Sequence, residues 1–244
     1  MKKYGLIGKT LKHSFSKKYF ETKFKDENIT DCTYDLYELE KIEDIKTLLQ
    51  SNPEIEGLNI TLPYKESVIP FLDELDESVK DTDACNCIKV ENGKLIGYNT
   101  DKEGFLEAFL SVMIMDYYKV IILGNGGASK AVAAALDELS LDYTIYARNP
   151  RGKYDVDWKE INEDIISDTS VIINTTPVGM WPNVDECPDI PYNAITRVQL
   201  AFDLIYNPEQ SEFLKRADAQ GAETENGMYM LELQADKAWE IFNS

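Results

Sequence analysis

The feature that most constrains this fold is an apolar segment followed at once by a glycine-rich turn and an alanine-rich segment. Residues Lys119–Leu123 (KVIIL) are continuously apolar after the first position, which is typical of a strand buried on both faces. Residues 124–129 (GNGGAS) follow, and a helix is then expected to about residue 139. A strand-turn-helix unit of this kind belongs to a parallel sheet covered by helices. The sequence therefore predicts an α/β protein.

The remaining patterns place more strands and helices on both sides of this unit. After it, strands are expected at 143–147, 171–174 and 200–203, and helices near 210–220 and 229–242, which together describe a Rossmann-type half. Before it, strands are expected at 3–7, 33–39, 58–62, 87–91 and 94–99, and helices from 16, at 41–49, 66–72 and 104–115. The Ser16 hydroxyl would cap the first of these helices, which carries Tyr19, Phe20 and Phe24 at helical spacing. Asn92-Gly93 between two of these strands indicates a hairpin turn.

These elements predict two α/β domains joined near residues 100–118. Residues 1–103 would form a domain with a mixed sheet, and residues 104–227 a Rossmann-type domain. The final helix, about 228–244, is expected to pack back on the first domain. The active site would lie in the cleft between the two, because open α/β sheets bind ligands beyond the carboxyl ends of their strands.

Composition excludes several classes of function. The 244 residues carry a formal net charge of −19, which disfavours binding to nucleic acid. No apolar run is long enough to span a membrane, and no signal peptide is readable. The four cysteines contain no CxxC pair, so they indicate buried thiols in a reducing cytoplasm and predict neither disulfides nor a metal site.

The glycine turn predicts a dinucleotide site, and the second strand predicts which dinucleotide. Two glycines let the backbone approach a pyrophosphate at a helix N-terminus, although a plain tight turn would look the same in isolation. The next strand ends at Arg148, and Arg151 and Lys153 follow. An acidic residue here would favour NAD, whereas arginine accommodates a 2′-phosphate. We therefore expect NADP, the other interpretation being a solvated basic loop.

Candidates for proton transfer are few. The only histidine, His13, is expected to shape a serine loop, and two Tyr-x-x-x-Lys matches precede the glycine turn and are expected to be solvated helix faces. Three polar clusters remain at expected strand ends: residues 13–16 (HSFS), 59–65 (NITLPYK) and 99–101 (NTD). Eight lysines within the first 25 residues surround the serine loop, and these either attract an anionic ligand or solvate a helix.

With these motifs the chain resembles the shikimate dehydrogenases over nearly its whole length. The matching segments keep the family's order: residues 8–16, 59–65, 86, 99–105, 124–128, 148, 174–180, 203–208 and 227–234. Departures lie beside the motifs: Lys102 stands for a glycine, and Ala147 and Asn149 stand for the asparagine and threonine that flank the arginine. They leave the substrate range and the preference for NADP more open than the fold.

The resemblance implies that residues 1–103 form a substrate-binding and catalytic domain and residues 104–227 a Rossmann-type NADP-binding domain. It also implies catalytic, substrate-binding and cofactor-binding roles for particular residues. Lys65 and Asp101 would be catalytic and would also contact substrate. The other substrate-binding residues would be Ser14, Ser16, Asn59, Thr61, Asn86, Tyr206 and Gln234. NADP would be held by Gly124, Asn125, Gly126, Gly127, Ala128, Arg148, Asn149, Arg151, Thr175, Thr176, Pro177, Gly227 and Met230.

The expected reaction is the reversible, NADPH-dependent reduction of 3-dehydroshikimate to shikimate in aromatic amino-acid biosynthesis. Lys65 would supply the proton or stabilise the alkoxide, with Asp101 holding the ammonium, and a close Lys–Asp pair titrates as a unit. Partners would be the small-molecule substrate and further copies of the chain, as a monomer or homodimer. Two alternatives stay open: a quinate/shikimate dehydrogenase with broader substrate or NAD use, and a nucleotide-binding sensor without turnover.

Overall fold

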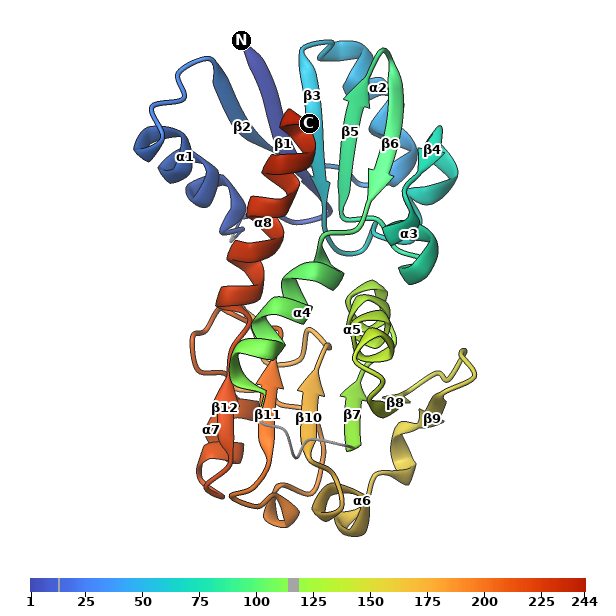
Figure 1. The fold of residues 1–244 in the computed structure, drawn as a ribbon, viewed down its shortest axis with the longest axis vertical. Helices are drawn as coiled ribbons and strands as arrows, with labels where there is room; N and C mark the ends of the chain where they lie inside the picture. The colour runs from blue at the N-terminus through green and yellow to red at the C-terminus, as the bar shows by residue number, and fades with distance from the viewer. Residues whose placement is uncertain (13, 114–118) are drawn as a thin grey trace. The chain divides into compact units, whose positions relative to one another are not determined.

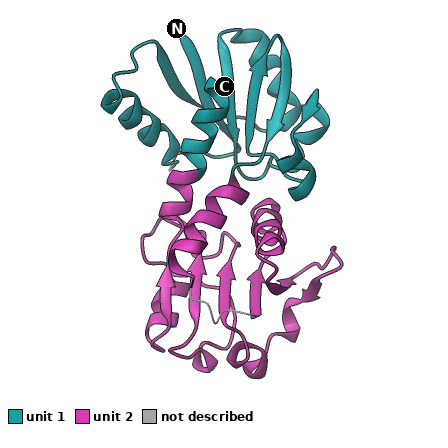
Figure 2. Cartoon of the chain, viewed as in Figure 1, with its two compact units in different colours: residues 1–100, 234–244 teal, residues 101–233 magenta. Residues whose placement is uncertain are grey.

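The computed structural model describes residues 1–12, 14–113 and 119–244, which form α/β structure throughout (Figure 1). The chain divides into two compact units, residues 1–100 with 234–244 and residues 101–233 (Figure 2). The boundaries therefore fall at the start of one helix and inside the last one. His13 and the expected helix end at 115 lie outside the described residues.

The first unit is built on a mixed six-stranded sheet. Its strands are β1 (Lys2–Gly8), β2 (Cys32–Glu38), β3 (Ile55–Ile60), β4 (Glu74–Leu75), β5 (Cys87–Glu91) and β6 (Lys94–Tyr98), in the order β2-β1-β3-β5-β6-β4. β1 pairs in parallel with β2 and β3, and β5 runs antiparallel to both β3 and β6. Asn92 and Gly93 have φ values of 51° and 79°, so the β5–β6 hairpin has the turn that its sequence predicts.

Four short helical segments and part of the last helix complete the first unit. They are α1 (Ser16–Asp26), the 3-10 turn Ile42–Asp44 leading into α2 (Ile45–Ser51), the 3-10 turn Ile69–Phe71, and α3 (Glu77–Thr82). Phe20 and Phe24 of α1 are buried against Tyr4, as the helical spacing predicts. Ala235, Ala238 and Phe242 of α8 (Met228–Asn243) belong to the same apolar cluster.

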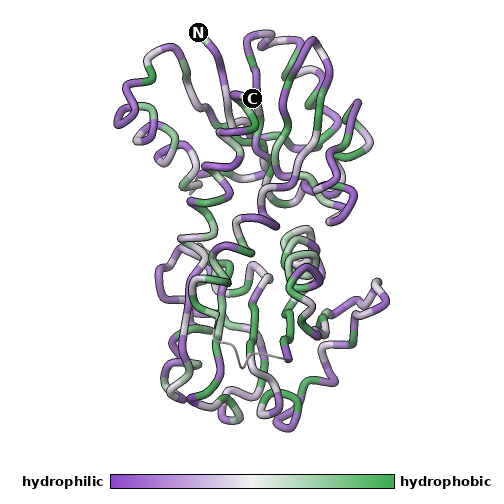
Figure 3. The backbone as a smooth tube through the Cα atoms, viewed as in Figure 1, coloured by the Kyte–Doolittle hydropathy of each residue, from purple (hydrophilic) through white to green (hydrophobic). Residues whose placement is uncertain are grey.

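The second unit contains an all-parallel six-stranded sheet of Rossmann type. Its strands are β7 (Lys119–Leu123), β8 (Asp142–Ala147), β9 (Asp155–Asp157), β10 (Val171–Asn174), β11 (Leu200–Asp203) and β12 (Glu223–Glu225), in the order β12-β11-β10-β7-β8-β9. The apolar stretches of β7, β10 and β11 are almost completely buried, and the hydrophobic colour follows them in Figure 3. The prediction of an α/β protein with one mixed and one parallel sheet is confirmed.

Helices accompany this sheet. They are α4 (Asp101–Val112), α5 (Gly127–Glu138), the 3-10 turn Trp158–Glu160, α6 (Glu163–Ser167), the 3-10 turn Tyr192–Ala194 and α7 (Glu212–Asp218). One apolar core contains Phe105 and Phe109 of α4 with Phe202 of β11. A second core contains Phe213 and Leu214 of α7 with Ile121 and Ile172 of the sheet.

Several local predictions were wrong. The helix expected at 66–72 is a series of turns with only the 3-10 segment Ile69–Phe71, because Pro70 cannot donate a helical hydrogen bond and restricts Ile69. α3, α6 and the short strands β4, β9 and β12 were not predicted. The cysteines were expected to be buried, yet only Cys85 and Cys87 are, while Cys32 and Cys187 are partly exposed.

None of the helices among the described residues is both long and apolar enough to cross a membrane. Among the same residues, no group of three or more histidine, cysteine, aspartate or glutamate side chains could hold a metal ion.

The packing of α8 on the first sheet can be tested at Gly57. A Cβ atom at this position of β3 would lie 2.3 Å from Cδ1 of Phe242. We expect Gly57→Ala to lower the free energy of unfolding, measured in urea, by about 1–3 kcal/mol through overpacking. In a Phe242→Leu background the same change should cost clearly less, and an equal cost in both backgrounds would contradict this packing.

Candidate active site

A buried hydrogen-bond network links several predicted substrate residues of the first unit. Asn86 Nδ2 donates to Thr100 Oγ1 at 2.9 Å and to Gln234 Oε1 at 3.4 Å, while Asn86 Oδ1 accepts from the Thr100 backbone N–H at 2.7 Å. Asn59 Nδ2 donates to the carbonyl oxygen of Asn86 at 3.4 Å. Asn59 and Asn86 are 6% and 2% exposed. The network therefore fixes which way these amides point.

Tyr34, which the sequence did not single out, extends this network to the serine loop. Its hydroxyl donates to Asn59 Oδ1 at 2.9 Å, and its ring stacks on Phe20 with centroids 4.2 Å apart. Complete burial raises the pKa of Tyr34 well above its usual range, while a hydrogen bond with Ser16 acts in the opposite direction. Tyr34 therefore connects the predicted residues Ser16 and Asn59 and stays protonated near neutral pH.

The serine loop differs from its prediction in one respect. Ser16 was expected to cap α1, but Phe15 occupies the N-cap position and makes no side-chain cap hydrogen bond. Instead Ser14 Oγ accepts from the Ser16 backbone N–H at 3.3 Å. The reason is that Ser16 already has helical geometry, so its hydroxyl is not placed to accept from the first helical turn. The histidine expected to shape this loop, His13, lies outside the described residues.

Thr61 and Lys65 follow β3 at the carboxyl end of that strand. The Thr61 backbone N–H donates to Ile7 at the end of β1 at 2.9 Å, and the Lys65 carbonyl oxygen accepts from the Cys85 N–H at 2.7 Å. Both side chains are partly exposed. Asp101 is the first residue of α4, is 5% exposed and belongs to the second unit. Lys65 thus lies in the turns that follow β3, and Asp101 lies at the start of α4.

The glycine turn of the second unit has the backbone form that a phosphate loop needs. Gly124 has φ +106°, and a Cβ there would lie 2.9 Å from Thr175 Oγ1 and from Thr176 Cγ2. Gly126 is the N-cap residue of α5, and a Cβ there would meet no atom within 4 Å. Gly124 is therefore required by its conformation and close contacts. Gly126 leaves the backbone N–H groups at the start of α5 accessible to an anion.

The basic loop after β8 lies on this turn. Asn125 Nδ2 donates to the carbonyl oxygen of Asn149 at 3.0 Å and to Oδ2 of Asp155 at 2.8 Å. Arg148, Asn149 and Arg151 are exposed. The loop backbone is therefore bonded to the glycine turn, and the loop carries two exposed arginines, where the sequence predicts a 2′-phosphate.

A second buried network stands at the carboxyl ends of β10 and β11. Oδ1 of Asp203 accepts from Asn174 Nδ2 and from the Ile205 N–H, each at 3.0 Å, and Oδ2 accepts from Ser211 Oγ at 2.5 Å. Oδ1 of Asn174 accepts from the N–H of Thr176 at 3.0 Å and from its hydroxyl at 2.7 Å. Asp203 therefore orients Asn174, which holds Thr176, whereas Thr175 bonds through its N–H and its hydroxyl to the carbonyl oxygen of Leu123. Both threonines were predicted to bind NADP.

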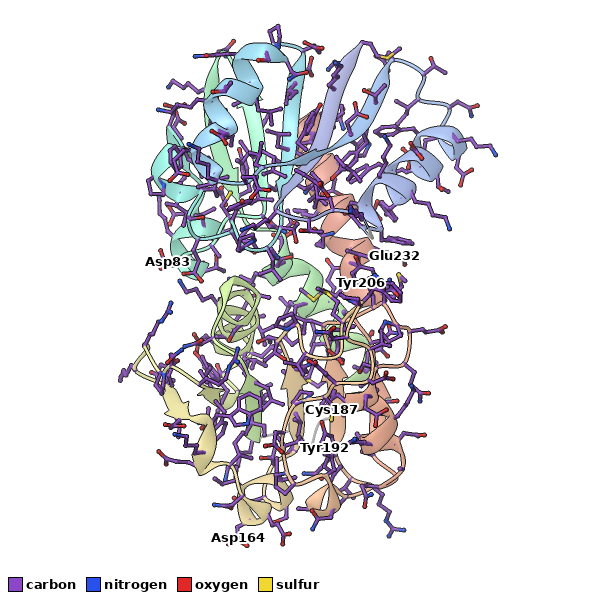
Figure 4. All side chains as sticks on the ribbon, turned by 180° about the vertical axis from the view of Figure 1, so that it is seen from behind. Asp83, Asp164, Cys187, Tyr192, Tyr206 and Glu232 are labelled. Carbon is purple, nitrogen blue, oxygen red and sulfur yellow. The ribbon has the colours of Figure 1, made fainter. Side chains whose placement is uncertain are left out.

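The remaining predicted residues follow β11 or begin α8. Tyr206 lies on the segment after β11 and is partly exposed (Figure 4). Gly227 donates its N–H to the Ile205 carbonyl oxygen at 3.1 Å, and a Cβ there would lie 2.1 Å from the carbonyl oxygen of Leu204. Met230 is 6% exposed and packs in the apolar core with Phe105 and Phe202. Gly227 thus permits a close backbone approach, and Met230 contributes mainly to the core.

Much of the lysine-rich N-terminal segment is neutralised by acidic side chains. Lys2 pairs with Glu56 at 2.8 Å, Lys17 with Asp35 at 3.1 Å and Lys23 with Asp236 at 2.8 Å. These acids come from β2, β3 and α8, which are distant in sequence. The segment is therefore less positive than its composition indicates.

The pH dependence of Asp203 can be tested by unfolding. Burial raises the pKa of Asp203 to about 6 from an ordinary value of 3.8, although three hydrogen bonds favour the carboxylate. Because the folded state favours the neutral acid, this contribution to stability is present below pH 4 and is lost as the pH rises through 6. Relative to Asp203→Asn, the wild-type free energy of unfolding should fall by about 2 kcal/mol between pH 4.5 and 7.5. A difference that does not change with pH would contradict this account.

Known proteins are similar to this chain in sequence and in fold. Residues 6–88 match the family model described as the shikimate dehydrogenase substrate binding domain. Shikimate dehydrogenase (NADP(+)) from Caldicellulosiruptor saccharolyticus is 36% identical over 259 residues, which cover 99% of this chain and 92% of that protein.

Solved structures agree over the whole chain. Shikimate dehydrogenase 1 from Peptoclostridium difficile has a TM-score of 0.89 at 32% identity, covering 100% of this chain and 92% of that one. The Thermus thermophilus shikimate 5-dehydrogenase in complex with NADP(H) and shikimate has a TM-score of 0.88 at 27% identity, with coverage of 99% and 93%. A quinate dehydrogenase from Corynebacterium glutamicum in complex with NAD has a TM-score of 0.85 at 28% identity, with coverage of 99% and 93%. The chain belongs to the shikimate dehydrogenase family.

Proposed function

We propose that this protein catalyses the reversible, NADPH-dependent reduction of 3-dehydroshikimate to shikimate, a step of aromatic amino-acid biosynthesis. The observation that carries the proposal is full-length membership of a family whose predicted catalytic residues, Lys65 and Asp101, are both present in this chain. The buried amide network of the first unit and the glycine turn of the second give independent physical support. A sensor that only binds nucleotide would need neither the lysine nor the aspartate.

The first unit supplies groups that match the substrate. Shikimate is a ring carboxylate with neighbouring hydroxyl groups, and Ser14 and Ser16 supply hydroxyl donors for the carboxylate. Asn59, Thr61, Asn86 and Gln234 supply amide and hydroxyl groups for the ring hydroxyls. Because the amides are already fixed by Tyr34 and Thr100, little side-chain entropy is lost when substrate binds.

Lys65 and Asp101 carry the proton chemistry. The ammonium of Lys65 stabilises the negative charge that develops on the reacting oxygen and gives that oxygen a proton. The carboxylate of Asp101 orients the ammonium and joins the hydrogen bonds of the reacting hydroxyl. In the oxidation direction the same pair receives the proton.

The second unit supplies the cofactor site. Gly124, Gly126 and Gly127 with the start of α5 would bind the pyrophosphate, and Arg148 with Arg151 the 2′-phosphate. The rest of the NADP molecule would be positioned by Thr175, Thr176 and Pro177. Of these, Thr176 is held by Asn174, which is in turn hydrogen-bonded to Asp203. NADPH, when bound, supplies the hydride. The free thiols of the described cysteines fit a cytoplasmic enzyme, acting as a monomer or homodimer.

A second candidate is a quinate/shikimate dehydrogenase that also uses NAD. The similarity to the Corynebacterium glutamicum quinate dehydrogenase supports it, as does the replacement of the usual threonine by Asn149. The distinguishing experiment is a kinetic matrix of shikimate and quinate against NADP and NAD. We expect kcat/KM to be highest for shikimate with NADP. Turnover of quinate with NAD at a comparable kcat/KM would favour the second candidate, and absence of turnover in all four combinations would refute both.

Replacement of Lys65 tests the proton chemistry. Lys65→Ala should lower kcat by a factor of about 10²–10⁴ with a smaller change in KM, because the group acts mainly in the transition state. Lys80→Ala, which removes an exposed lysine of α3 in the same unit, serves as the control and should keep wild-type kcat. A Lys65→Ala enzyme that turns over at the wild-type rate would remove this residue from the mechanism.

Replacement of Arg148 tests the cofactor preference. Arg148→Ala should raise KM for NADP by roughly tenfold or more while changing KM for NAD little, because only NADP carries the 2′-phosphate. Arg197→Ala removes an exposed arginine elsewhere in the second unit and should change neither value. Equal increases for NADP and NAD after Arg148→Ala would show that Arg148 does not bind the 2′-phosphate.

A further inference from the structure

The loop between β8 and β9 is short for a connection between parallel strands. Only residues 148–154 separate the two strands, whereas such connections commonly need about a dozen residues and include a helix. The pairing explains how seven residues suffice. Asp155 pairs with Ile145, so the chain returns past only two residues of β8 and then runs beside the end of that strand. The basic loop is therefore held close to the carboxyl edge of the sheet.

One carboxylate ties this loop together. Oδ2 of Asp155, the first residue of β9, accepts from the backbone N–H of Arg151 at 2.9 Å and from Asn125 Nδ2 at 2.8 Å. The same Asn125 amide donates to the Asn149 carbonyl oxygen at 3.0 Å. The start, middle and end of the loop are thus joined to the glycine turn through Asn125 and Asp155.

Asp155 carries a negative charge beside the loop that is proposed to bind the 2′-phosphate. A carboxylate beside a phosphate site weakens phosphate binding by Coulomb repulsion if it does nothing else. Although partial burial acts to raise its pKa, hydrogen bonds from Arg151, Asn125 and Gly152 hold the pKa of Asp155 below its usual value. The carboxylate is therefore charged at neutral pH, and its hydrogen bonds are directed at the loop and the glycine turn.

We propose that Asp155 is a positioning residue for cofactor preference, which holds the basic loop on the glycine turn so that Arg148 and Arg151 meet the 2′-phosphate. The proposal rests on the NADP site proposed above and goes beyond it, because Asp155 itself touches no phosphate. Its carboxylate acts through Asn125 and the Arg151 backbone. It fixes in advance a loop that would otherwise lose conformational entropy when the cofactor binds.

The test measures the 2′-phosphate contribution without catalysis. Isothermal titration gives the dissociation constants of 2′,5′-ADP and 5′-AMP, and their ratio reports the preference for the 2′-phosphate. The proteins compared are the wild type, Asp155→Ala, Asp155→Asn and a control, Asp157→Ala. The control removes the same charge from the same strand, but its carboxylate accepts from the Lys159 N–H and not from the loop.

The proposal predicts that removing the Asp155 carboxylate lowers the preference for 2′,5′-ADP, whereas relief of Coulomb repulsion alone would raise it. Asp155→Ala should reduce the preference for 2′,5′-ADP about tenfold, since the charge-assisted hydrogen bonds from Asn125 and the loop backbone are lost. Asp155→Asn keeps a carbonyl acceptor and should reduce it by a factor of about two to three, whereas Asp157→Ala should leave it unchanged. If Asp155→Ala does not fold, as judged by its thermal melt, the proposal is tested by whether Asp155→Asn reduces the preference for 2′,5′-ADP.

Other results overturn the proposal. An increased preference in the Asp155 variants would show that the carboxylate only repels the phosphate, and an unchanged preference would show that it has no part in cofactor preference. An equal weakening of both ligands, or an equal effect of Asp157→Ala, would show a merely structural role. A wild type that binds 2′,5′-ADP no better than 5′-AMP would instead refute the proposed NADP preference, which distinguishes the two failures.

Discussion

Strand pairing is the constraint on which both candidate sites depend: it is parallel in the second unit, whereas in the first unit antiparallel pairing of β5 with β3 and β6 also brings Asn86 beside Asn59 and Thr100. In the second unit β7, β10 and β11 end together, with Asn174 opposite both Leu123 and Asp203, so the glycine turn and the Asn174–Asp203 network share one edge. In the first unit β1 and β3 pair in parallel with Leu6 opposite Asn59. Residues far apart in the chain are thereby brought to one edge of each sheet, where buried side-chain hydrogen bonds fix their orientation. Rigid strands and satisfied polar networks together preorganise the groups that the proposed reaction needs.

The long, periodic segments of the fold could be predicted from the sequence. The strands β7, β10 and β11 begin and end where their apolar runs predict, because burial on both faces leaves a continuous apolar pattern. The helix expected at 66–72 was wrong because Pro70 has no N–H to donate to a helical hydrogen bond, whatever the apolar periodicity around it. The strand β9 could not be predicted, since three half-buried residues carry no periodic signal and depend on pairing with β8.

The candidate site was predictable wherever a local motif carries its chemistry, as in the glycine turn and the segments around Lys65 and Asp101. Residues that act through others were missed. Tyr34 reads as an ordinary strand tyrosine, and its link to Asn59 exists only in the folded sheet. Asp155 lies beyond the basic loop, and its proposed role depends on hydrogen bonds with Asn125 and the Arg151 backbone that form only in the fold. Likewise, the N-terminal lysines were expected either to attract an anion or to solvate a helix, and their acidic partners, such as Asp236, are distant in sequence.

The central claim is that this chain transfers a hydride between shikimate and NADP. The most direct measurement uses shikimate that carries deuterium on the carbon whose hydroxyl becomes the ketone, followed by mass spectrometry of the NADPH formed. The account predicts one deuterium atom in every NADPH molecule, together with a slower rate when the chemical step is limiting. NADPH formed without deuterium, or no NADPH at all, would contradict it.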